Sequence, residues 1–267
     1  MEKVRRVLVY LSKESSVPEC ARFVQSITGH FADSETDLVE VSCSLENNRF
    51  ILYGQDGGKR GPGVMLKRAS FCPFKHISKS EAAALPVGVQ SRGVDVGVVV
   101  LLQSANQKLL LTRRAAGMSI FPNVWVPPGG HIEFDEKMVD AGLRELREET
   151  GLKINQEDIS SQILGLWEAS LRPEPAEVSG CLWVDAEIVK GIVSAVDGEE
   201  DAGKLPENLP QTVSMWEVSP EGRLCPSVLP VSILCSRALA VGEDVERVST
   251  GTKFALELWL KTMEPQR

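Results

Sequence analysis

The chain has 267 residues, of which 43% are hydrophobic, and its 37 acidic and 29 basic side chains give a formal net charge of −8. This length allows one large domain, or one catalytic domain with smaller flanking modules, around a sizeable core. The acidic balance argues against general nucleic-acid binding, which depends on clustered Lys and Arg. We therefore expect no DNA partner, and we expect any RNA contact to be local and helped by metal.

The six cysteines lie at wide, irregular spacings without a CxxC pair, at positions 20, 43, 72, 181, 225 and 235. These spacings argue against a zinc ribbon and a disulfide scaffold, and they favour free thiols in a reducing compartment. The apolar run at residues 7–11 is too short for a signal peptide, and no stretch reaches the roughly 18 apolar residues that span a bilayer. We expect no membrane partner and a cytoplasmic location, with the nucleus as the alternative.

The N-terminal residues show one strand signal and one helix signal. Val4–Leu11 is apolar enough for a strand. Ser16–Thr28 places its apolar side chains at helical spacing, and Gly29 follows as a helix stop. We therefore predict a strand followed by a helix.

A hairpin signal follows. Leu38–Cys43 and Arg49–Tyr53 flank Glu46-Asn47-Asn48, and the segment 55–63 is rich in Gly and charge, as linkers are. Residues 1–63 are therefore predicted to be a small α+β module with its linker, and 64–91 a connecting segment.

Residues 92–218 carry the signals of a mixed α/β domain. Val94–Leu102 is rich in Val and Leu, which predicts a strand buried largely on both faces. A turn at 104–107 leads to a returning strand at 108–112, and a short strand ends in a tight turn at Gly129-Gly130.

A helix is predicted to begin at an Asp135 cap and to run to about Thr150, with Gly151 in the position that favours a left-handed residue. Two further strands, at 163–167 and 180–184, are followed by a short helix at 187–196. Residues 219–267 are expected to be a tail with a helix around 252–262.

The spacing that starts at Gly130 is the strongest signal in the chain. Five residues separate Gly130 from Glu136, and seven more precede the run that begins at Arg144. The full set is Gly130, Glu136, Arg144, Glu145, Leu146, Glu148, Glu149, Gly151 and Leu152.

The helix places three carboxylates on one side. At 100° per residue, Glu145, Glu148 and Glu149 fall within a 100° arc, where like charges repel by a few tenths of a kcal/mol per pair. A hard divalent cation offsets this repulsion, because Mg²⁺ and Mn²⁺ prefer oxygen ligands. Such a run of charge is more often a solvated helix face, and only the Gly pair before the helix favours the metal site.

The segment 130–152 resembles the Nudix hydrolase family. The resemblance implies an α/β/α sandwich around a mixed sheet. It implies Mg²⁺ or Mn²⁺ held by Glu145, Glu148 and Glu149 with the Gly130 carbonyl nearby, and water attack on a phosphorus of a nucleoside diphosphate linked to another group. A bound ion lowers the pKa of a water, and one carboxylate, with Glu145 favoured, accepts the proton. Arg144 lies one turn before Glu148 and is placed to orient it.

A longer resemblance covers residues 92–152, the segment Phe71-Cys72-Pro73-Phe74 and the tail segment 246–256. It is similar to a branch of the family that removes the N7-methylguanosine cap of RNA, and it implies release of the cap nucleoside diphosphate, m7GDP. The box itself recognises diphosphate and metal only, so free nucleotides, dinucleotides and CoA-type diphosphates stay open as alternative substrates.

Several side chains outside the box are candidate substrate contacts. Arg113 and Arg114 follow a strand and are candidates to bind phosphates. The alternative is that they are ordinary surface arginines, which are common. His131 is a weaker phosphate contact. Trp167 and Trp183 are candidates for base stacking, with core packing as the simpler interpretation. Two further candidate acids are Glu168 and Glu177.

The chain departs from the family after residue 170. Only residues 171–177 separate two strands where the family has a longer segment with a core strand, and two prolines in seven residues do not form an interior strand. We therefore predict a shortened form that lacks several tens of residues. This keeps a third hypothesis open, a catalytically inactive binding or regulatory protein that retains the box.

Overall fold

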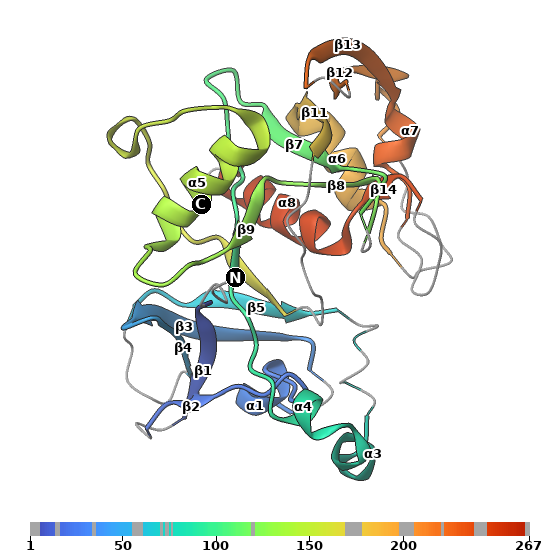
Figure 1. Cartoon of the computed structure of the whole chain (residues 1–267). Helices are drawn as coiled ribbons and strands as arrows, with labels where there is room; N and C mark the ends of the chain where they lie inside the picture. The colour runs from blue at the N-terminus through green and yellow to red at the C-terminus, as the bar shows by residue number, and fades with distance from the viewer. Residues whose placement is uncertain are drawn as a thin grey trace. The chain divides into compact units, whose positions relative to one another are not determined.

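The computed structural model describes residues 6–13, 17–33, 36–54, 61–69, 72, 75, 77–118, 121–168, 178–197, 206–219, 222–237 and 245–264. The chain forms two compact units that are interleaved in sequence (Figure 1). The first unit comprises residues 1–98, 131–141 and 159–171, and the second comprises residues 99–130, 142–158 and 172–267. Each unit is described by itself below.

The first unit is built on a six-stranded mixed sheet. Its strands, in spatial order, are β10 (Gly165–Glu168), β5 (Val64–Arg68), β3 (Leu38–Glu46), β4 (Arg49–Tyr53), β1 (Leu8–Ser12) and β2 (Glu19–Cys20). β1 runs parallel to β4 and β10 runs parallel to β5, whereas the other pairs are antiparallel. The unit also contains three short helices, α1 (Thr28–Phe31), α3 (Lys79–Ala84) and α4 (Val87–Gln90).

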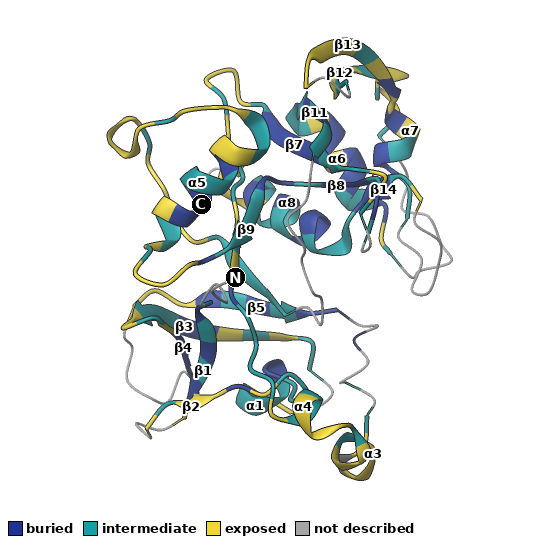
Figure 2. Ribbon diagram, viewed as in Figure 1, coloured by how far each residue is buried: buried dark blue, intermediate teal, exposed yellow. Residues whose placement is uncertain are grey.

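The predicted hairpin is confirmed. Glu46 pairs with Arg49 across the β3–β4 turn, and Asn47 and Asn48 have φ values of 48° and 61°. Asn tolerates this left-handed region better than most residues, so the Asn pair fixes the turn and the register. The apolar side chains of these strands join one buried cluster with Val7, Val96 and Ile132 (Figure 2).

The helix predicted at residues 16–28 is wrong. Glu19 and Cys20 pair with β1, and the backbone N–H groups of Ala21 and Phe23 donate to the carbonyls of Val9 and Arg92. These long-range hydrogen bonds use the donors that a helix needs, so tertiary pairing overrides the local apolar spacing. Gly29 lies inside α1 and does not end a helix.

The long buried strand predicted at 94–102 is also wrong. Only β6 (Gly97–Val99) is a strand, it pairs with β9 (Gly129–His131), and Val99 is 62% exposed. The two ends of the segment bond to different parts of the chain: the Val96 N–H donates to the Val7 carbonyl, whereas the Val100 N–H donates to the Pro128 carbonyl. No single partner strand accompanies the whole run.

The second unit contains a second six-stranded mixed sheet. Its strands, in spatial order, are β13 (Leu224–Pro230), β12 (Thr212–Val218), β11 (Val178–Val184), β7 (Leu109–Arg114), β8 (Val124–Val126) and β14 (Arg247–Val248). β14 runs parallel to β8, and the other pairs are antiparallel. β7 and β11 confirm two predicted strands, whereas β12 and β13 lie where no strand was predicted.

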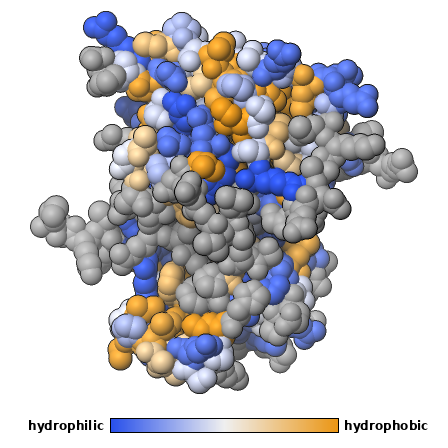
Figure 3. All heavy atoms as spheres, turned by 90° about the vertical axis from the view of Figure 1, so that its right-hand side faces the viewer, coloured by the Kyte–Doolittle hydropathy of each residue, from blue (hydrophilic) through white to orange (hydrophobic). Residues whose placement is uncertain are grey.

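One face of this sheet is the core of the second unit. Leu109, Leu111, Leu182, Val184 and Met215 share that face by register, and each is at most 2% exposed. On the other face the burial fades toward β12 and β13, where apolar side chains reach the surface (Figure 3). One face of the sheet is therefore buried in the core, whereas the other is partly open to solvent at β12 and β13.

Besides most of α5 (Met138–Thr150), the helices described in the second unit are α6 (Ala186–Ser194), α7 (Val231–Leu234) and α8 (Thr250–Met263), and η2 (Gln156–Asp158) is a 3₁₀ turn. α6 and α8 agree with the predicted helices. Asp185 caps α6 by accepting from the Ile188 N–H, and Ser249 caps α8 in the same way. Within the described residues, no helix is long and apolar enough to cross a membrane.

Other predictions lie partly outside the described residues. These are most of the linker at 55–63, the Phe71-Cys72-Pro73-Phe74 segment except Cys72, Glu177 and the short segment 171–177. The division of the chain at residues 63, 91 and 218 stays a prediction. β5, predicted as part of a connecting segment, lies inside the first unit's sheet.

Candidate functional site

The candidate site is built around helix α5 (Met138–Thr150), which carries the run predicted from the sequence. Leu146 is fully buried, and Glu145, Glu148 and Glu149 lie near it in the sequence of the helix. The helix ends as predicted, because Gly151 has φ of +73° and its N–H donates to the Arg147 carbonyl at 2.9 Å.

Two glycines are required by close contacts at this helix. A Cβ at Gly130 would lie 2.3 Å from both Cδ and Oε1 of Glu145. A Cβ at Gly142 would lie 2.8 Å from Cγ2 of Val100, which confirms the close packing expected inside the helix. The Glu145 carboxyl group thus occupies the space that any side chain at position 130 would fill, and it lies directly against the glycine turn.

Glu149 is the most perturbed acid of the site. Burial raises the pKa of its carboxyl group to about 7, and the nearby charge of Glu145 acts in the same direction. The Gly129 N–H, the Thr112 hydroxyl group and the charge of Arg114 act in the opposite direction. The Thr112 hydroxyl lies 3.4 Å from Oε2 of Glu149. A largely buried acid held by these donors is typical of a functional site.

Arg144 connects the other two glutamates. Its Nη1 lies 2.7 Å from Oε1 of Glu145 and 3.4 Å from Oε2 of Glu148. The Glu148 side chain is 60% exposed, so one carboxylate faces solvent while the other two are set into the protein. The predicted orienting role of Arg144 thus extends to Glu145 as well as Glu148.

The donors of the site suit a hard divalent cation, since they are carboxylate and backbone carbonyl oxygens. Among the residues that the structure describes, however, no three His, Cys, Asp or Glu side chains are grouped to hold a metal ion together. The physical reason is that Glu145 and Glu148 both turn toward Arg144. Side-chain rotation about the fixed helix is enough to regroup them, because the backbone already places residues 145, 148 and 149 on one side.

The N-terminal end of α5 differs from the prediction. Asp135 does not cap the helix, which begins at Met138. Asp135 has φ of +65°, and it exchanges two hydrogen bonds with the side chain of Asn48. Glu136 closes the turn before the helix, because its Oε2 accepts from the Glu133 N–H at 3.1 Å. The glutamate in the box at position 136 is therefore placed to shape the turn.

Arg113 is held by the protein itself. Its guanidinium lies 3.1 Å from Oε1 of Glu246 and 3.4 Å from Oε1 of Glu217, and Nε donates to the Ser179 hydroxyl group. It also lies over the ring of Trp125, a fully buried residue whose indole N–H donates to the same Glu246 oxygen. These contacts use the face of the guanidinium and all three of its nitrogens, which leaves little for a phosphate.

Arg114 and His131 complete the predicted substrate contacts. Arg114 donates from Nε to the Phe121 carbonyl, and its charge acts on Glu149, so it lies on the catalytic side of the sheet. His131 ends β9 and belongs to the first unit, as does Glu136. The structure therefore groups Gly130, Arg114, Arg144 and the three glutamates in the second unit.

The remaining candidates take different positions. Glu168 accepts from the N–H groups of Ile27 and Thr28, at 2.8 and 2.9 Å, so it holds the start of α1 in the first unit. Trp167 lies on β10, paired with Lys67. Trp183 lines a pocket that also contains Trp216, which sequence reasoning missed. The alternating pattern of residues 212–218 was the signal that could have placed Trp216 on a strand.

Comparison with known proteins finds a family domain that includes the segment 130–152. The NUDIX domain family matches residues 91–221. The m7GpppN-mRNA hydrolase NUDT17 of Danio rerio is 59% identical to the chain, across 99% of this chain and 98% of that protein. The Xenopus laevis protein of the same name is 44% identical over 98% of this chain and 97% of its own length. The Homo sapiens protein of that name is 38% identical over 96% and 88%.

The alignment with the Danio rerio protein also shows that the chain is the shorter of the two. It spans 299 positions, whereas the chain has 267 residues, so at least 299 − 267 = 32 positions lie opposite gaps. This agrees with a loss of several tens of residues, while the predicted place of the loss, 171–177, lies outside the described residues. Identity at this level over nearly the whole chain, together with the intact box on α5, makes the chain a member of the Nudix hydrolase family.

Proposed function

We propose that this chain is a divalent-metal-dependent pyrophosphohydrolase that removes the N7-methylguanosine cap from RNA and releases m7GDP. The observation that carries the proposal is the Glu145 carboxyl group seated against Gly130, beside the buried carboxyl group of Glu149. The cap as substrate is supported by the relatives, which are named m7GpppN-mRNA hydrolases and match over nearly the whole chain.

The proposed metal ligands are Glu145, Glu148, Glu149 and the carbonyl of Gly130, for Mg²⁺ or Mn²⁺. When bound, the ion neutralises phosphate charge and lowers the pKa of a water molecule. Water oxygen then bonds to phosphorus while the anhydride bond breaks, which yields m7GDP and a 5′-monophosphate RNA end. Glu145 is the proposed proton acceptor, because its carboxyl group lies against Gly130 and close enough to Glu149 for its charge to act on it.

Other side chains of the site have separate proposed roles. Arg114 is the proposed phosphate-binding arginine, since its charge acts on Glu149. Arg113 is assigned to the framework, because Glu246, Glu217 and Ser179 occupy its guanidinium. His131 stays a proposed phosphate contact of lower rank.

The direct test is a turnover assay on capped RNA with Mg²⁺ and with Mn²⁺, in which m7GDP is identified as the product. We expect release of m7GDP by the unmodified chain and a loss of at least ~100-fold in the Glu148→Gln, Glu149→Gln variant, because metal ligation is removed. Glu187→Gln is the matched control, since Glu187 is an exposed acid on α6 that pairs with Lys190. Activity that survives in the double variant would contradict the metal-site assignment.

The same assay separates the alternative substrates. A panel of free nucleotides, dinucleotides and CoA-type diphosphates shares the phosphoanhydride bond but lacks the methylated base. Turnover of one of these above that of capped RNA would replace the cap as the substrate. Absence of turnover for every substrate with both ions would favour the inactive binding protein. A cytoplasmic place of action belongs to this proposal and is tested by cell fractionation.

A further inference from the structure

We propose that Trp183 and Trp216 bind the N7-methylated guanine base, in a pocket on the same sheet face as the catalytic glutamates. This inference rests on the proposed function and adds to it the site that recognises the methylated base. It is carried by the register of β11 and β12, by the pocket between them, and by the link from that pocket to Glu149.

The register places the two indoles on one face of the sheet. Trp216 pairs directly with Cys181, and Trp183 lies two residues further along β11. Side chains two residues apart on a strand share a face, so Trp183 and Trp216 are diagonal neighbours, about 7–8 Å apart. Aromatic side chains at diagonal positions are within reach of each other, so one flat base lying over these strands can contact both rings.

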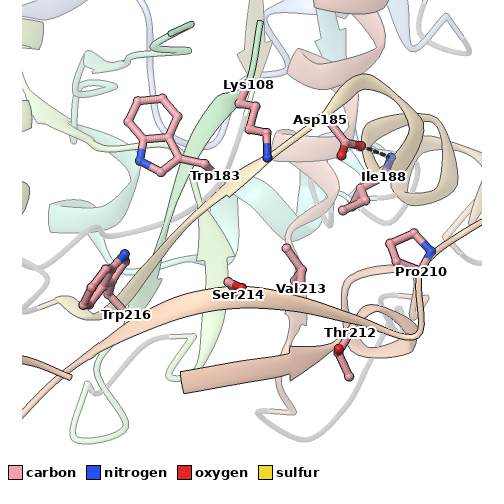
Figure 4. Close-up of a pocket in the computed structure, with 9 residues that line it drawn as sticks. All are labelled: Lys108, Trp183, Asp185, Ile188, Pro210, Thr212, Val213, Ser214 and Trp216. Atoms are coloured by element: carbon pink, nitrogen blue, oxygen red, sulfur yellow. Dashed lines mark hydrogen bonds between the residues drawn. The ribbon is translucent and has the colours of Figure 1, made fainter. Parts of the chain in front are cut away.

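A pocket of about 330 Å³ lies over these strands. Its lining combines the two indoles with polar and charged side chains from β7, β11 and β12 (Figure 4). The lining includes Lys108, Trp183, Asp185, Ser214 and Trp216. Figure 4 shows the two tryptophans at one end of the pocket and Asp185 and Pro210 toward the other. Pockets of this size and mixed lining are typical of small-molecule sites.

The same sheet face leads from the indoles to the catalytic acids. Cys181 pairs with Thr112 on one side and with Trp216 on the other, so these three residues form a row across β7, β11 and β12. The hydroxyl group of Thr112 contacts Glu149 at 3.4 Å. Neighbouring strands lie ~4.8 Å apart, which puts Trp216 about 10 Å from Thr112 along the row. A base on the indoles therefore sends its phosphates toward the glutamates.

The chemistry of the pocket favours a methylated purine. N7-methylation gives the guanine ring a positive charge, and an indole face attracts a cation more strongly than the rings of Tyr or Phe do. Trp216 is 44% exposed and Trp183 is half-buried, so both rings remain open to a ligand. Lys108 lies on the same face, two residues before Leu110, which pairs with Trp183.

Asp185 has a structural role, because its Oδ1 accepts the Ile188 N–H at the start of α6, and the proposal gives it no contact with the base. The exposed apolar side chains of β13 offer a competing occupant. Val228 pairs with Ser214 and is 65% exposed, so a protein partner on this face would contact Val228 as well as Trp216. A methylated base and a protein partner are distinguished by comparing m7GDP with GDP, which lacks the methyl group and the positive charge.

The test measures binding of m7GDP and GDP to the full chain by isothermal titration calorimetry without divalent metal, so turnover does not enter. Base stacking on one aromatic ring corresponds to about 10- to 100-fold in affinity. We expect Trp183→Ala and Trp216→Ala each to weaken m7GDP binding by that factor and GDP binding by less, and Trp216→Phe to restore most of the loss. Val228→Ala, on the same face outside the pocket, is expected to leave both affinities unchanged.

Three results would overturn the inference. They are equal binding of m7GDP and GDP by the unmodified chain, unchanged m7GDP binding in both Ala variants, and a Val228→Ala loss as large as that of Trp216→Ala, which would indicate a partner surface. Thermal unfolding and the Phe variant show whether an Ala variant has simply failed to fold. Failure of the proposed function looks different: m7GDP binding then depends on both tryptophans while capped RNA is not cleaved. Cleavage whose KM is unaffected in both Ala variants would retain the function and reject the pocket.

Discussion

At the scale of single residues, the site depends on the lack of a side chain at Gly130. Gly130 leaves room for the Glu145 carboxyl group, which lies where a Cβ would be, and the Gly129 N–H donates to Glu149. The glycine pair thus positions two of the three glutamates. Sequence reasoning expected the glycines to admit a backbone carbonyl to the metal, and the structure adds that they admit the carboxylates.

Gly130→Ala is expected to reduce kcat of capped-RNA hydrolysis by roughly 100-fold, because the new methyl group would lie 2.3 Å from Glu145 and displace its carboxylate by about 1 Å. The measurement is steady-state turnover with Mg²⁺. Gly117→Ala is the control, since no atom lies within 4 Å of a Cβ at that position. Equal activity of the two variants would show that the position of Glu145 is not critical.

Glu149 predicts how the metal-free chain responds to pH. Its carboxyl pKa is about 7 in the folded state against 4.5 for the ordinary group, so the folded state binds the proton more tightly than the unfolded chain does. The contribution of Glu149 to stability is therefore largest below pH 4.5, falls as the pH rises to about 7, and is lost above that, with a total loss on the order of 3 kcal/mol.

The check is urea unfolding in EDTA between pH 4.5 and 8. Glu149→Gln is expected to remove most of this slope and to be more stable than the unmodified chain at pH 8, although it is inactive. Mg²⁺ binds the ionised carboxylate, so it is expected to raise Tm more at pH 8 than at pH 5. A slope of the same size in Glu149→Gln would assign the effect to another group.

At the scale of elements, turn residues predicted the β3–β4 hairpin and the end of α5, whereas the apolar patterns at 16–28 and 94–102 gave wrong predictions. Asn47 and Asn48 fix the β3–β4 turn through their own φ values, and Gly151 ends α5 in the same way. The residues 16–28 have helical spacing, yet the N–H of Ala21 donates to Val9 across the sheet. Such a contact depends on the rest of the fold, so the local pattern does not reveal it.

The role of Arg113 shows the same limit for the candidate site. Its position after a strand suggested a phosphate contact, but its partner Glu246 is 133 residues away along the chain. No spacing rule connects the two. The shared side of Glu145, Glu148 and Glu149 was predictable, because these residues lie within two turns of one helix. The Arg113 cluster and the Trp216 pocket instead combine residues from strands that are distant in sequence.

Arg113→Ala is expected to lower the free energy of unfolding by about 2–4 kcal/mol, because it leaves the partly buried Glu246 without its charged partner. Arg114→Ala is expected instead to raise KM with a smaller change in stability. Urea unfolding and steady-state kinetics separate the two effects. Lys190→Ala, which breaks an exposed pair with Glu187, is the control and is expected to change stability by less than ~1 kcal/mol. A KM effect confined to Arg113→Ala would reverse the two roles.

At the scale of the whole molecule, the chain keeps the catalytic helix while it is shorter than its relatives. At least 32 aligned positions of the Danio rerio protein have no counterpart here, yet every position of the box is present on α5 and its flanking turns. In the proposed site the box alone holds the metal, whereas turnover would also depend on the surfaces that hold the substrate. The two properties are therefore expected to separate in this chain.

We expect this chain and the Danio rerio relative to gain the same Tm from Mg²⁺, within about 2 °C, since both effects arise at the box. We expect kcat/KM on capped RNA to be at least ~10-fold lower for this chain, which corresponds to 1.4 kcal/mol of lost transition-state binding. Side-by-side thermal unfolding and single-turnover assays make the comparison. Equal turnover would show that the missing positions lie outside the substrate site, whereas a smaller Tm gain would place the loss at the metal site itself.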